Sequence, residues 1–546
     1  MGDSQADERT TPTAFVREST GLVKNVSFFD SIAMNMSNMS VGALLGVIGI
    51  SGLIPMFFAG VDMAGVNLVL LSVIAFAVSL PQVVIYTMMS RRYPRTGGDY
   101  VYVSRNLGGP LGSILSFMGY TTETTAYLGL IVLSTVFAIG SVGLFFTFDP
   151  NLLGLAVPSG PITDPAGLAM PSLQFLVGAV IFAALVAINI LKPKAGYKVV
   201  STFTIFGFFS ILLAMGVLLS AGSTGVQNYI NSAGGAFAIN GSSTFNVVSS
   251  QYPGGSFSWA SNLFLLPLMA AFVYPWLNAS PAVASEIKGG TARRWNVPIS
   301  AFLVFAFLTS ALGVMYLTAG QAFTNAAYSN PTLVFGLPPA ATSFNFWTLA
   351  MGVSGNSVIA GIIGLGWIVA NMSVLAYGII VISRYLLAQS FDRFLPSRIS
   401  TVSPRFGSPY LALLISLIVT VALVGFAAFA YSSGGVGGAD ALFGAIIASM
   451  IYFIFVSLSA VIHGLKKEHG LSKLILVAAG IVNIPIFGYL AYEFLAYPGV
   501  WSLDPLTYYF VIGSVVVGAL LYAGSWWYNK KRGIDISLAY RELPPE

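Results

Sequence analysis

The sequence predicts an all-α membrane protein, a polytopic bundle of 12 transmembrane helices. Of its 546 residues, 56% are hydrophobic and only 8% are charged, and the mean hydropathy is +0.83. A soluble domain carries roughly 25% charged residues, and such a fold could not cover this much apolar surface. Apolar stretches of about 20 residues, the length that crosses a bilayer as a helix, recur along the whole chain. The protein is therefore expected to be embedded in the membrane rather than anchored to it.

Polar breaks divide the apolar sequence into the predicted spans. The first six are residues 28–58, 67–90, 111–140, 173–191, 199–221 and 259–284. The second six are residues 297–319, 346–387, 410–430, 442–463, 474–496 and 506–527. Because a lone segment in lipid must satisfy its own backbone hydrogen bonds, each span is expected to be helical.

The positions of the 24 lysines and arginines provide an independent test of these spans. Basic residues in short loops remain on the cytoplasmic side of a membrane. All 24 fall on one side of the predicted bundle, whereas the opposite loops carry only carboxylates. We therefore expect a multi-pass protein of the plasma membrane with both termini in the cytoplasm. The lipid bilayer, and not a nucleic acid, is the partner that this charge pattern indicates.

The composition also argues against several kinds of chemistry. The chain has no cysteine, and its only histidines, His463 and His469, lie in one short polar segment. Disulfides, thiolate metal sites and iron–sulfur clusters are thus excluded, and no cofactor or metal is expected. Glu123 stands at membrane depth without a second carboxylate, histidine or cysteine, so an embedded enzyme is not expected. A channel would carry rings of charge or a filter sequence, and neither is evident.

Two spans contain helix breakers near their centres. The first carries SNMSVG at 37–42, where polar side chains compete for backbone hydrogen bonds and a glycine adds flexibility. The sixth carries Pro275 within FVYPWLN at 272–278, and proline supplies no N–H. Broken backbone within a membrane is tolerated where protein covers it or where it lines a wet cavity. The pair predicts a transporter binding site; the alternatives are a simple proline kink and a small-residue packing patch.

The spacing of the two breaks predicts an internal repeat. The first and sixth spans are corresponding members of two five-helix halves, as in an inverted repeat with its site at the midplane. The expected parts are a disordered cytoplasmic tail (1–24), a first repeat (25–221), an outer loop (222–258), a second repeat (259–463), two peripheral helices (464–528) and a cytoplasmic tail (529–546).

Three stretches resemble the amino acid, polyamine and organocation (APC) transporter superfamily. GGDYVYVSRNLGGPLG at 97–112 looks like its cytoplasmic entry motif, and residues 383–409 resemble its motif that ends in a basic loop and a proline. The sixth span, through Glu286, keeps the family's register. The resemblance covers almost the whole chain. It implies an amino acid permease with a LeuT-like fold, ten core helices plus two peripheral ones, that moves amino acids or amines by alternating access.

The resemblance also implies which residues bind the substrate. The broken segment of the first span would bind the carboxylate and amino groups, and the sixth span would form the facing wall. The first set is Ser37, Asn38, Met39, Ser40, Val41 and Gly42. The second set is Phe272, Val273, Tyr274, Pro275 and Trp276. Trp276 stands where the family commonly has glycine, so its indole is expected to reduce or reshape the pocket.

Three further residues are candidates for ion or proton coupling. Glu123 lies about twelve residues into the third span, or ~18 Å along a helix, which is near mid-membrane. An intramembrane carboxyl is a functional hypothesis by default: a proton carrier or a counter-ion for a substrate amine. The alternative is a protonated group hydrogen-bonded to the neighbouring threonines. A sodium site, by the family resemblance, would combine carbonyls of the first break with Asn371 and Ser373, although polar packing explains these two equally well.

The sequence therefore predicts a secondary active transporter for amino acids or related amines, coupled to H⁺ or Na⁺ or acting by exchange. Because a fold does not fix a function, a carrier of the same fold for a nucleobase or other organic solute remains the alternative. A nutrient sensor built on a transporter fold is the other alternative.

Overall fold

The computed structural model describes only part of the chain. The described residues are 21–47, 64–147, 149–157, 167–233, 244–329, 345–432, 442, 445–498, 501 and 505–541. They form helices and no named strand, and their only β-type contacts are the isolated bridges Val26–Ile287 and Thr96–Val283. Most of the predicted disordered tail, the end of the first predicted span and the last five residues lie outside the described part.

Ten runs of helix in the described residues are long and apolar enough to cross a membrane. Each overlaps one of the predicted spans. Nine are single helices: α3 (Leu68–Arg92), α8 (Pro171–Leu191), α9 (Pro193–Ala233), α14 (Gly290–Thr318), α17 (Ser357–Phe391), α18 (Tyr410–Ser432), α20 (Ile446–Lys467), α21 (Gly470–Ala496) and α22 (Pro505–Lys531). The tenth is a continuous run of α5 (Gly109–Ser116), the π-helix η2 (Phe117–Thr122) and α6 (Glu123–Phe146). The predicted all-α class is confirmed.

The two remaining predicted spans are the ones with helix breakers, and both are interrupted. The first contains α1 (Phe28–Asn38) and α2 (Val41–Val47). The sixth contains α11 (Trp259–Phe264), α12 (Pro267–Ala270) and α13 (Ala279–Ala282), followed by the 3-10 turn η4 (Ala284–Glu286). Within the described residues, neither span forms a continuous membrane-length helix.

Two predicted boundaries differ from the structure. Residues 346–387, predicted as one span, form α16 (Phe346–Val353) and α17. The Asn356 side chain caps α17 by accepting a hydrogen bond from the Val358 N–H at 2.9 Å, so it begins a new helix. The predicted outer loop, 222–258, contains helix: α9 bends at Gly222, whose φ is 62°, but continues to Ala233, and α10 (Thr244–Ser249) follows.

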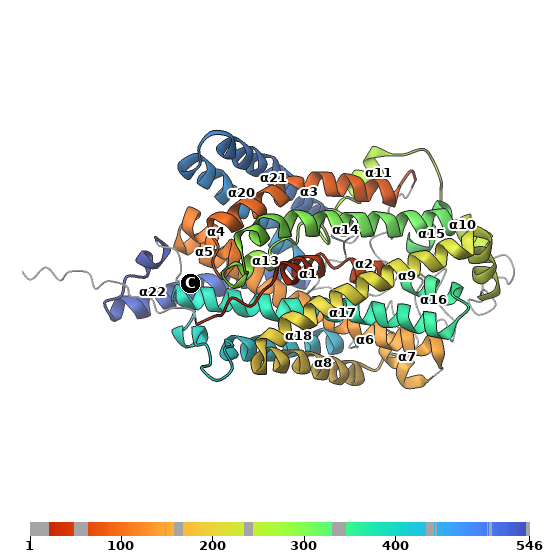
Figure 1. The fold of residues 1–546 in the computed structure, drawn as a ribbon, viewed down its shortest axis with the longest axis horizontal. Helices are drawn as coiled ribbons and strands as arrows, with labels where there is room; N and C mark the ends of the chain where they lie inside the picture. The colour runs from red at the N-terminus through yellow and green to blue at the C-terminus, as the bar shows by residue number, and fades with distance from the viewer. Residues whose placement is uncertain are drawn as a thin grey trace, which may run out of the picture.

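The bundle has two different ends (Figure 1). One end holds α4 (Gly98–Leu107), α5 and the C-terminal segment with η7 (Ile536–Tyr540). The opposite end holds α7 (Pro150–Ala156), α10, α15 (Gln321–Ser329) and α16. We call the first the basic end, because Arg105 on α4 and Arg384 near the end of α17 form ion pairs there.

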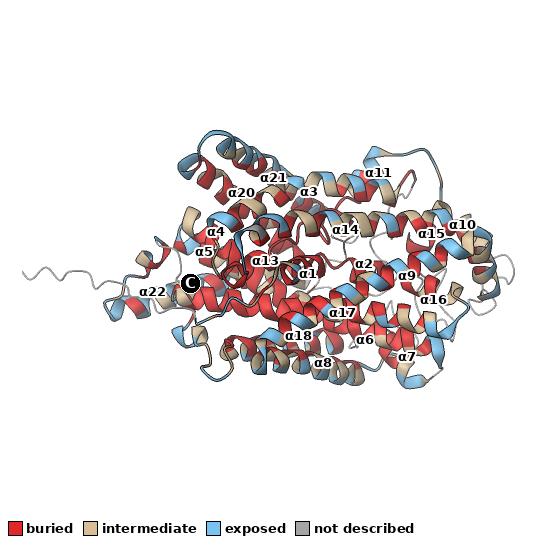
Figure 2. Cartoon of the chain, viewed as in Figure 1, coloured by how far each residue is buried: buried red, intermediate tan, exposed pale blue. Residues whose placement is uncertain are grey.

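Burial distinguishes the central helices from the peripheral ones. Figure 2 shows buried residues concentrated along α1, α6, α13 and α17. In the most apolar window of the run that contains α6, 83% of the residues are buried, against 17% in that of α22. A helix at the outside of a membrane bundle exposes apolar side chains to lipid, so α22 has the surface of a peripheral, lipid-facing helix.

Candidate functional site

The first break is a sharp turn between α1 and α2. α1 ends at Asn38, and Ser40 has a φ of 52°, a left-handed conformation that is uncommon outside glycine. The Ser40 hydroxyl donates a hydrogen bond to the carbonyl oxygen of Asn38 at 3.0 Å. The Tyr127 hydroxyl on α6 donates to Ser40 Oγ at 3.4 Å. Local strain and side-chain hydrogen bonds thus hold an interruption of only two residues, 39–40.

The second break is longer. Residues 271–278, between α12 and α13, are not helical, and all of them are buried. Pro275 within this segment has no N–H. The N–H groups of Val273 and Tyr274 both donate to the Met269 carbonyl, at 3.1 and 3.0 Å. The Trp276 indole donates to the Ala271 carbonyl at 2.8 Å, so this side chain satisfies part of the unwound backbone.

The two breaks meet through buried amide side chains. The Asn38 Nδ2 donates to Asn278 Oδ1 at 2.8 Å, and the Tyr377 hydroxyl of α17 donates to Asn38 Oδ1. One turn earlier in α1, Asn35 Nδ2 donates to Ser280 Oγ at 2.8 Å and Asn35 Oδ1 accepts from the Ser280 N–H at 2.9 Å. Segments about 240 residues apart in the sequence are therefore joined directly.

Asp99 extends this contact, and the sequence analysis did not identify it as a site residue. Its carboxylate is fully buried and accepts hydrogen bonds from the hydroxyls of Tyr86 at 2.6 Å, Tyr452 at 3.2 Å and Tyr385. Asn278 Nδ2 also donates to it, at 3.3 Å. Burial raises the pKa of the Asp99 carboxyl above its ordinary value, and the hydrogen bonds from the tyrosines and Asn278 oppose that rise.

A glycine explains how Asp99 reaches the second break. Gly98 has a φ of 46°, and a Cβ there would lie 3.0 Å from the Ala282 nitrogen. The neighbouring Gly97 N–H donates to the Ala282 carbonyl at 2.9 Å. The paired glycines at the start of α4 therefore allow its backbone to pack directly on α13. The Gly-Gly-Asp sequence could have identified Asp99 as a candidate, since an acid beside two glycines indicates a closely packed turn.

Glu123 lies beside the first break. It is 2% exposed and follows η2, a π-helical turn of the kind that often marks functional sites. Its Oε2 accepts a hydrogen bond from Thr124 Oγ1 at 3.3 Å. It interacts electrostatically with Tyr127 and Tyr377, the two tyrosines that contact Ser40 and Asn38. Tyr127 and Tyr377 are therefore the side chains through which this carboxyl can influence the first break.

Part of the predicted site lines one narrow cavity. The cavity lies between the first break, α9 and α17, and its volume of about 10 Å³ leaves room for little more than one water molecule. The predicted residues on its wall are Ser37, Ser40, Val41, Gly42 and Ser373. Thr204 of α9 adds a hydroxyl, 2.6 Å from that of Ser37. Oxygen atoms from three elements therefore converge beside the first break.

The other predicted residues are directed elsewhere. Phe272 packs against Phe494 of α21, with ring centroids 5.8 Å apart, and the Tyr274 hydroxyl lies 2.5 Å from that of Ser72 on α3. Asn371 accepts from Ser134 on α6 at 3.1 Å, so it does not share the cavity with Ser373. Met39, Val273 and Pro275 are buried in the breaks.

Trp276 belongs to the second break, and its side chain contacts Tyr127, a residue that also contacts the first break. Its ring stacks on Tyr127 with centroids 6.2 Å apart and an interplanar angle of 10°. It also meets Phe453 of α20 edge-on, at 5.6 Å between centroids. Tyr127 also bonds Ser40, but Trp276 is not on the wall of the narrow cavity, so the expected effect of its indole on the pocket stays a prediction.

Buried ion pairs hold the basic end together. The Glu286 carboxylate pairs with the Arg384 guanidinium through two hydrogen bonds, of 2.8 and 2.9 Å, and accepts a third from Tyr197 at 2.7 Å. Arg105 pairs in the same two-bonded way with Asp392. All four charged side chains are at most 4% exposed. We call Glu286–Arg384 and Arg105–Asp392 the basic-end ion pairs.

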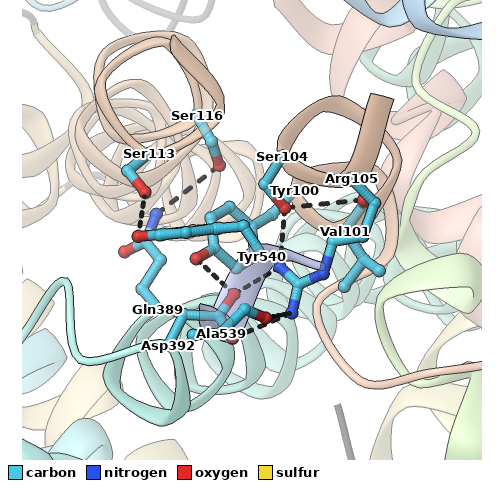
Figure 3. Close-up of polar contacts among 10 residues, drawn as sticks. All are labelled: Tyr100, Val101, Ser104, Arg105, Ser113, Ser116, Gln389, Asp392, Ala539 and Tyr540. Atoms are coloured by element: carbon cyan, nitrogen blue, oxygen red, sulfur yellow. Dashed lines mark hydrogen bonds and ion pairs between the residues drawn. The ribbon is translucent and has the colours of Figure 1, made fainter. Parts of the chain in front are cut away.

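The C-terminal segment covers the second of these pairs (Figure 3). The Arg105 guanidinium donates to the Ala539 carbonyl at 3.2 Å, and the Tyr540 hydroxyl lies 2.9 Å from that of Ser113. The Tyr100 hydroxyl donates to Asp392 at 2.7 Å. The segment η7 is therefore packed on the last turn of α4 and on α5.

Comparison with known protein families now assigns the chain. A family whose description is "Amino acid permease" matches residues 26–518, which include both breaks, the α4 motif and the basic-end ion pairs. This is a family of transporters and not of enzymes, and its members carry amino acids or related solutes. The chain therefore belongs to the amino acid permease family of the APC superfamily, as the resemblance of its motifs predicted.

Proposed function

We propose that this permease is a secondary active transporter that moves amino acids or related amines across the membrane by alternating access. The observation that carries the proposal is the direct contact of two interrupted helices through Asn38 and Asn278, 2.8 Å apart. Broken helices supply free backbone groups for a substrate's charged ends. Family membership supports amino acids or related solutes as cargo.

The architecture that fits this function has 12 transmembrane helices. The ten long helical runs of the described residues support ten of them, and we assign the two interrupted spans as the other two. The first and sixth members are the interrupted ones, which favours a LeuT-like arrangement of two five-helix repeats, with α21 and α22 as the peripheral pair. Basic residues bias an end of a membrane protein to the cytoplasm, so the basic end and both termini would face the cytoplasm of a plasma-membrane protein.

In this proposal the first break holds the carboxylate and amino groups of the substrate. Ser37, Ser40, Val41 and Gly42 are its members on the cavity wall, and Trp276 limits the room beside them. Asp99 positions Asn278 through its hydrogen bond. Glu123 exchanges a proton or faces the substrate amine. If sodium is the coupling ion, Ser373 is the better-placed ligand, because Asn371 bonds Ser134 on α6 instead.

The test is uptake of labelled amino acids and amines into proteoliposomes with an imposed proton or sodium gradient. We expect accumulation of at least one amino acid or amine, and loss of its proton-driven accumulation in Glu123→Gln. Glu493→Gln is the matched control, because Glu493 is also a buried glutamate, 4% exposed, but lies on peripheral α21.

Each result points to a definite conclusion. If gradient-driven uptake persists in Glu123→Gln, Glu123 is not the coupling residue. The proposal that the protein is a carrier would still hold. Uptake of nucleobases in the same vesicles, with no uptake of amino acids or amines, would support the alternative that the protein carries another organic solute. Binding of an amino acid without any flux would support a sensor.

A further inference from the structure

We propose that a pocket at the basic end binds the headgroup of an anionic phospholipid. The pocket lies between the connection that follows α17 and the last turns of α22, is open to the outside, and has about 520 Å³ of room for water-sized molecules. It is lined by Arg393, Phe394, Leu395, Pro396, Ser397, Arg398, Leu520, Leu521, Gly524, Ser525, Tyr528, Asn529 and Arg532. None of these residues belongs to the proposed transport site, so this site stands apart from the proposed function.

The charge of the pocket selects an anion. Its lining residues include three arginines, Arg393, Arg398 and Arg532, and no aspartate or glutamate. Asp392, the nearest carboxylate in the sequence, is paired with Arg105 and is fully buried. Guanidinium groups bind phosphate oxygens through paired hydrogen bonds. Three of them around one open pocket therefore suit a phosphodiester.

The two walls of the pocket are fixed to one another. The Ser525 hydroxyl of α22 donates to the Arg393 carbonyl, and Asn529 Nδ2 donates to the Ser525 carbonyl at 2.8 Å. Arg393 itself has a φ of 58°, which turns the chain directly after α17. The arginines of the connection therefore lie beside α22 by a specific contact and not by chance proximity.

The pocket lies at the level in the membrane where lipid headgroups lie. Trp526, Trp527 and Tyr528, next to the pocket-lining turn of α22, are 46%, 56% and 53% exposed. Such side chains gather where a membrane meets water. Lys530 and Lys531 lie over the two indole rings, with the ammonium 4.6 and 3.6 Å from the ring centroids. These residues place the arginines at the membrane surface, at the end of α22 seen beside α4 and α5 (Figure 1).

The remaining wall of the pocket suits a lipid better than a free phosphate ion. Leu520, Leu521 and Gly524 line it on the side that faces the middle of α22, and Leu520 is 67% exposed. Arg532 follows Leu520 by twelve positions, about 18 Å along the helix. A headgroup held by the arginines would lead its acyl chains along this apolar surface. Basic pockets on the inner face of membrane proteins bind such lipids.

The experiment is a native mass spectrometry titration of the purified full-length protein with phosphatidylglycerol or phosphatidylcholine. We expect one phosphatidylglycerol to be retained in preference to phosphatidylcholine. Arg398→Gln/Arg532→Gln should weaken its binding by at least about tenfold, since each surface cation contributes on the order of 1 kcal/mol. Lys466→Gln/Lys473→Gln is the matched control, because it removes two exposed charges near α20 and α21 and should leave binding unchanged.

Three outcomes would overturn the proposal. The first is equal retention of the two lipids, and the second is equal weakening by the control pair. The third is displacement of the lipid by millimolar inorganic phosphate, which would assign the pocket to a soluble anion. Arg398→Lys/Arg532→Lys tests whether misfolding explains the loss. This variant keeps both positive charges, so it should keep most of the preference for phosphatidylglycerol. A loss as large as that of the glutamine pair would show that charge does not hold the lipid.

Discussion

The polar groups at the two breaks and those at the basic end are both buried, but they are paired in different ways. At the breaks, neutral amides and a hydroxyl connect Asn38, Asn278 and Tyr377. At the basic end, two arginines are each held by a carboxylate through two hydrogen bonds, as for Arg384 with Glu286. The breaks therefore contact each other through neutral groups, one of which also bonds the Asp99 carboxyl, whereas the basic end is held by ion pairs.

If the protein works by the alternating access proposed above, with the substrate at the first break, this difference indicates which step of the cycle is costly. A neutral hydrogen bond contributes about 0.5–1.5 kcal/mol, so the contacts between the breaks can be exchanged for contacts with a substrate at small cost. A buried ion pair is costly to break when one charge stays unpaired, about 3–5 kcal/mol. Opening the basic end therefore requires the arginines and carboxylates to reach water or new partners together.

The largest expected effect comes from unpairing one of these charges. Glu286→Gln leaves the 4% exposed Arg384 without its carboxylate, and should lower the free energy of unfolding by about 3–5 kcal/mol. A denaturant titration of the purified protein measures this loss.

Two further variants define the cause of that loss. Glu286→Gln/Arg384→Gln should be less damaging than the single change, because no charge remains unpaired. Arg92→Gln breaks the Arg92–Glu468 pair, in which Arg92 is 45% and Glu468 7% exposed, and should cost less than Glu286→Gln, because the removed charge is half-exposed and His463 still lies 3.4 Å from the Glu468 carboxylate. Equal losses for Arg92→Gln and Glu286→Gln would contradict the contrast between the fully buried pair and the half-exposed one.

The elements that could be predicted from sequence are those that composition alone determines. The length of the apolar stretches, together with the side of the bundle on which each basic residue falls, predicted the positions of the ten membrane-length helices. The helix breakers predicted where two other spans are interrupted. The break between α16 and α17 was missed because residues 354–356 are too short a polar signal within an apolar stretch.

The site was predicted less completely, because an unwound segment has no periodicity. In a helix the faces of Phe272 and Tyr274 follow from spacing, but residues 271–278 are not helical, and these two rings point to α21 and α3. Asp99 was missed for another reason: its burial depends on packing of α4 against α13, a contact between segments about 180 residues apart. Such proximity is a property of the fold and not of local sequence.

A smaller effect is expected where the breaks contact each other. Asn38→Ala and Asn278→Ala each remove one partner of a buried hydrogen bond and should lower the free energy of unfolding by about 1–3 kcal/mol. The double variant should lose less than the sum of the two, by on the order of 1 kcal/mol. Denaturant titration of the four proteins measures this coupling.

The matched control for this cycle is Asn189→Ala. Asn189 is also buried, but its side chain donates only to the Leu185 carbonyl in its own helix, at 2.9 Å. Its effect should add to that of Asn38→Ala. If the losses of unfolding free energy in Asn38→Ala and Asn278→Ala also added up in the double variant, the 2.8 Å contact would not couple the breaks. The proposed role of the pair would then fail.

The smallest expected effect is a dependence of stability on pH, and it compares one buried carboxyl with one exposed carboxyl. The pKa of Asp99 in the fold lies above its ordinary value of 3.8 because the group is buried. As pH rises past 3.8, the unfolded chain loses this proton first, so the folded protein holds more protons and stability falls with rising pH. Asp99→Asn should remove that decline from the thermal unfolding midpoint.

Asp535 should show the opposite sign. It is exposed, and hydrogen bonds from Ser537 lower the pKa of its carboxyl below the ordinary value. The folded state therefore releases its proton first, and stability from this group appears as pH rises through that range. Asp535→Asn should slightly reduce the gain in stability with pH, whereas Asp99→Asn should increase it. Midpoint profiles that shift in the same direction for both variants would contradict the assignment of the Asp99 effect to burial, because the two carboxyls differ chiefly in their exposure to water.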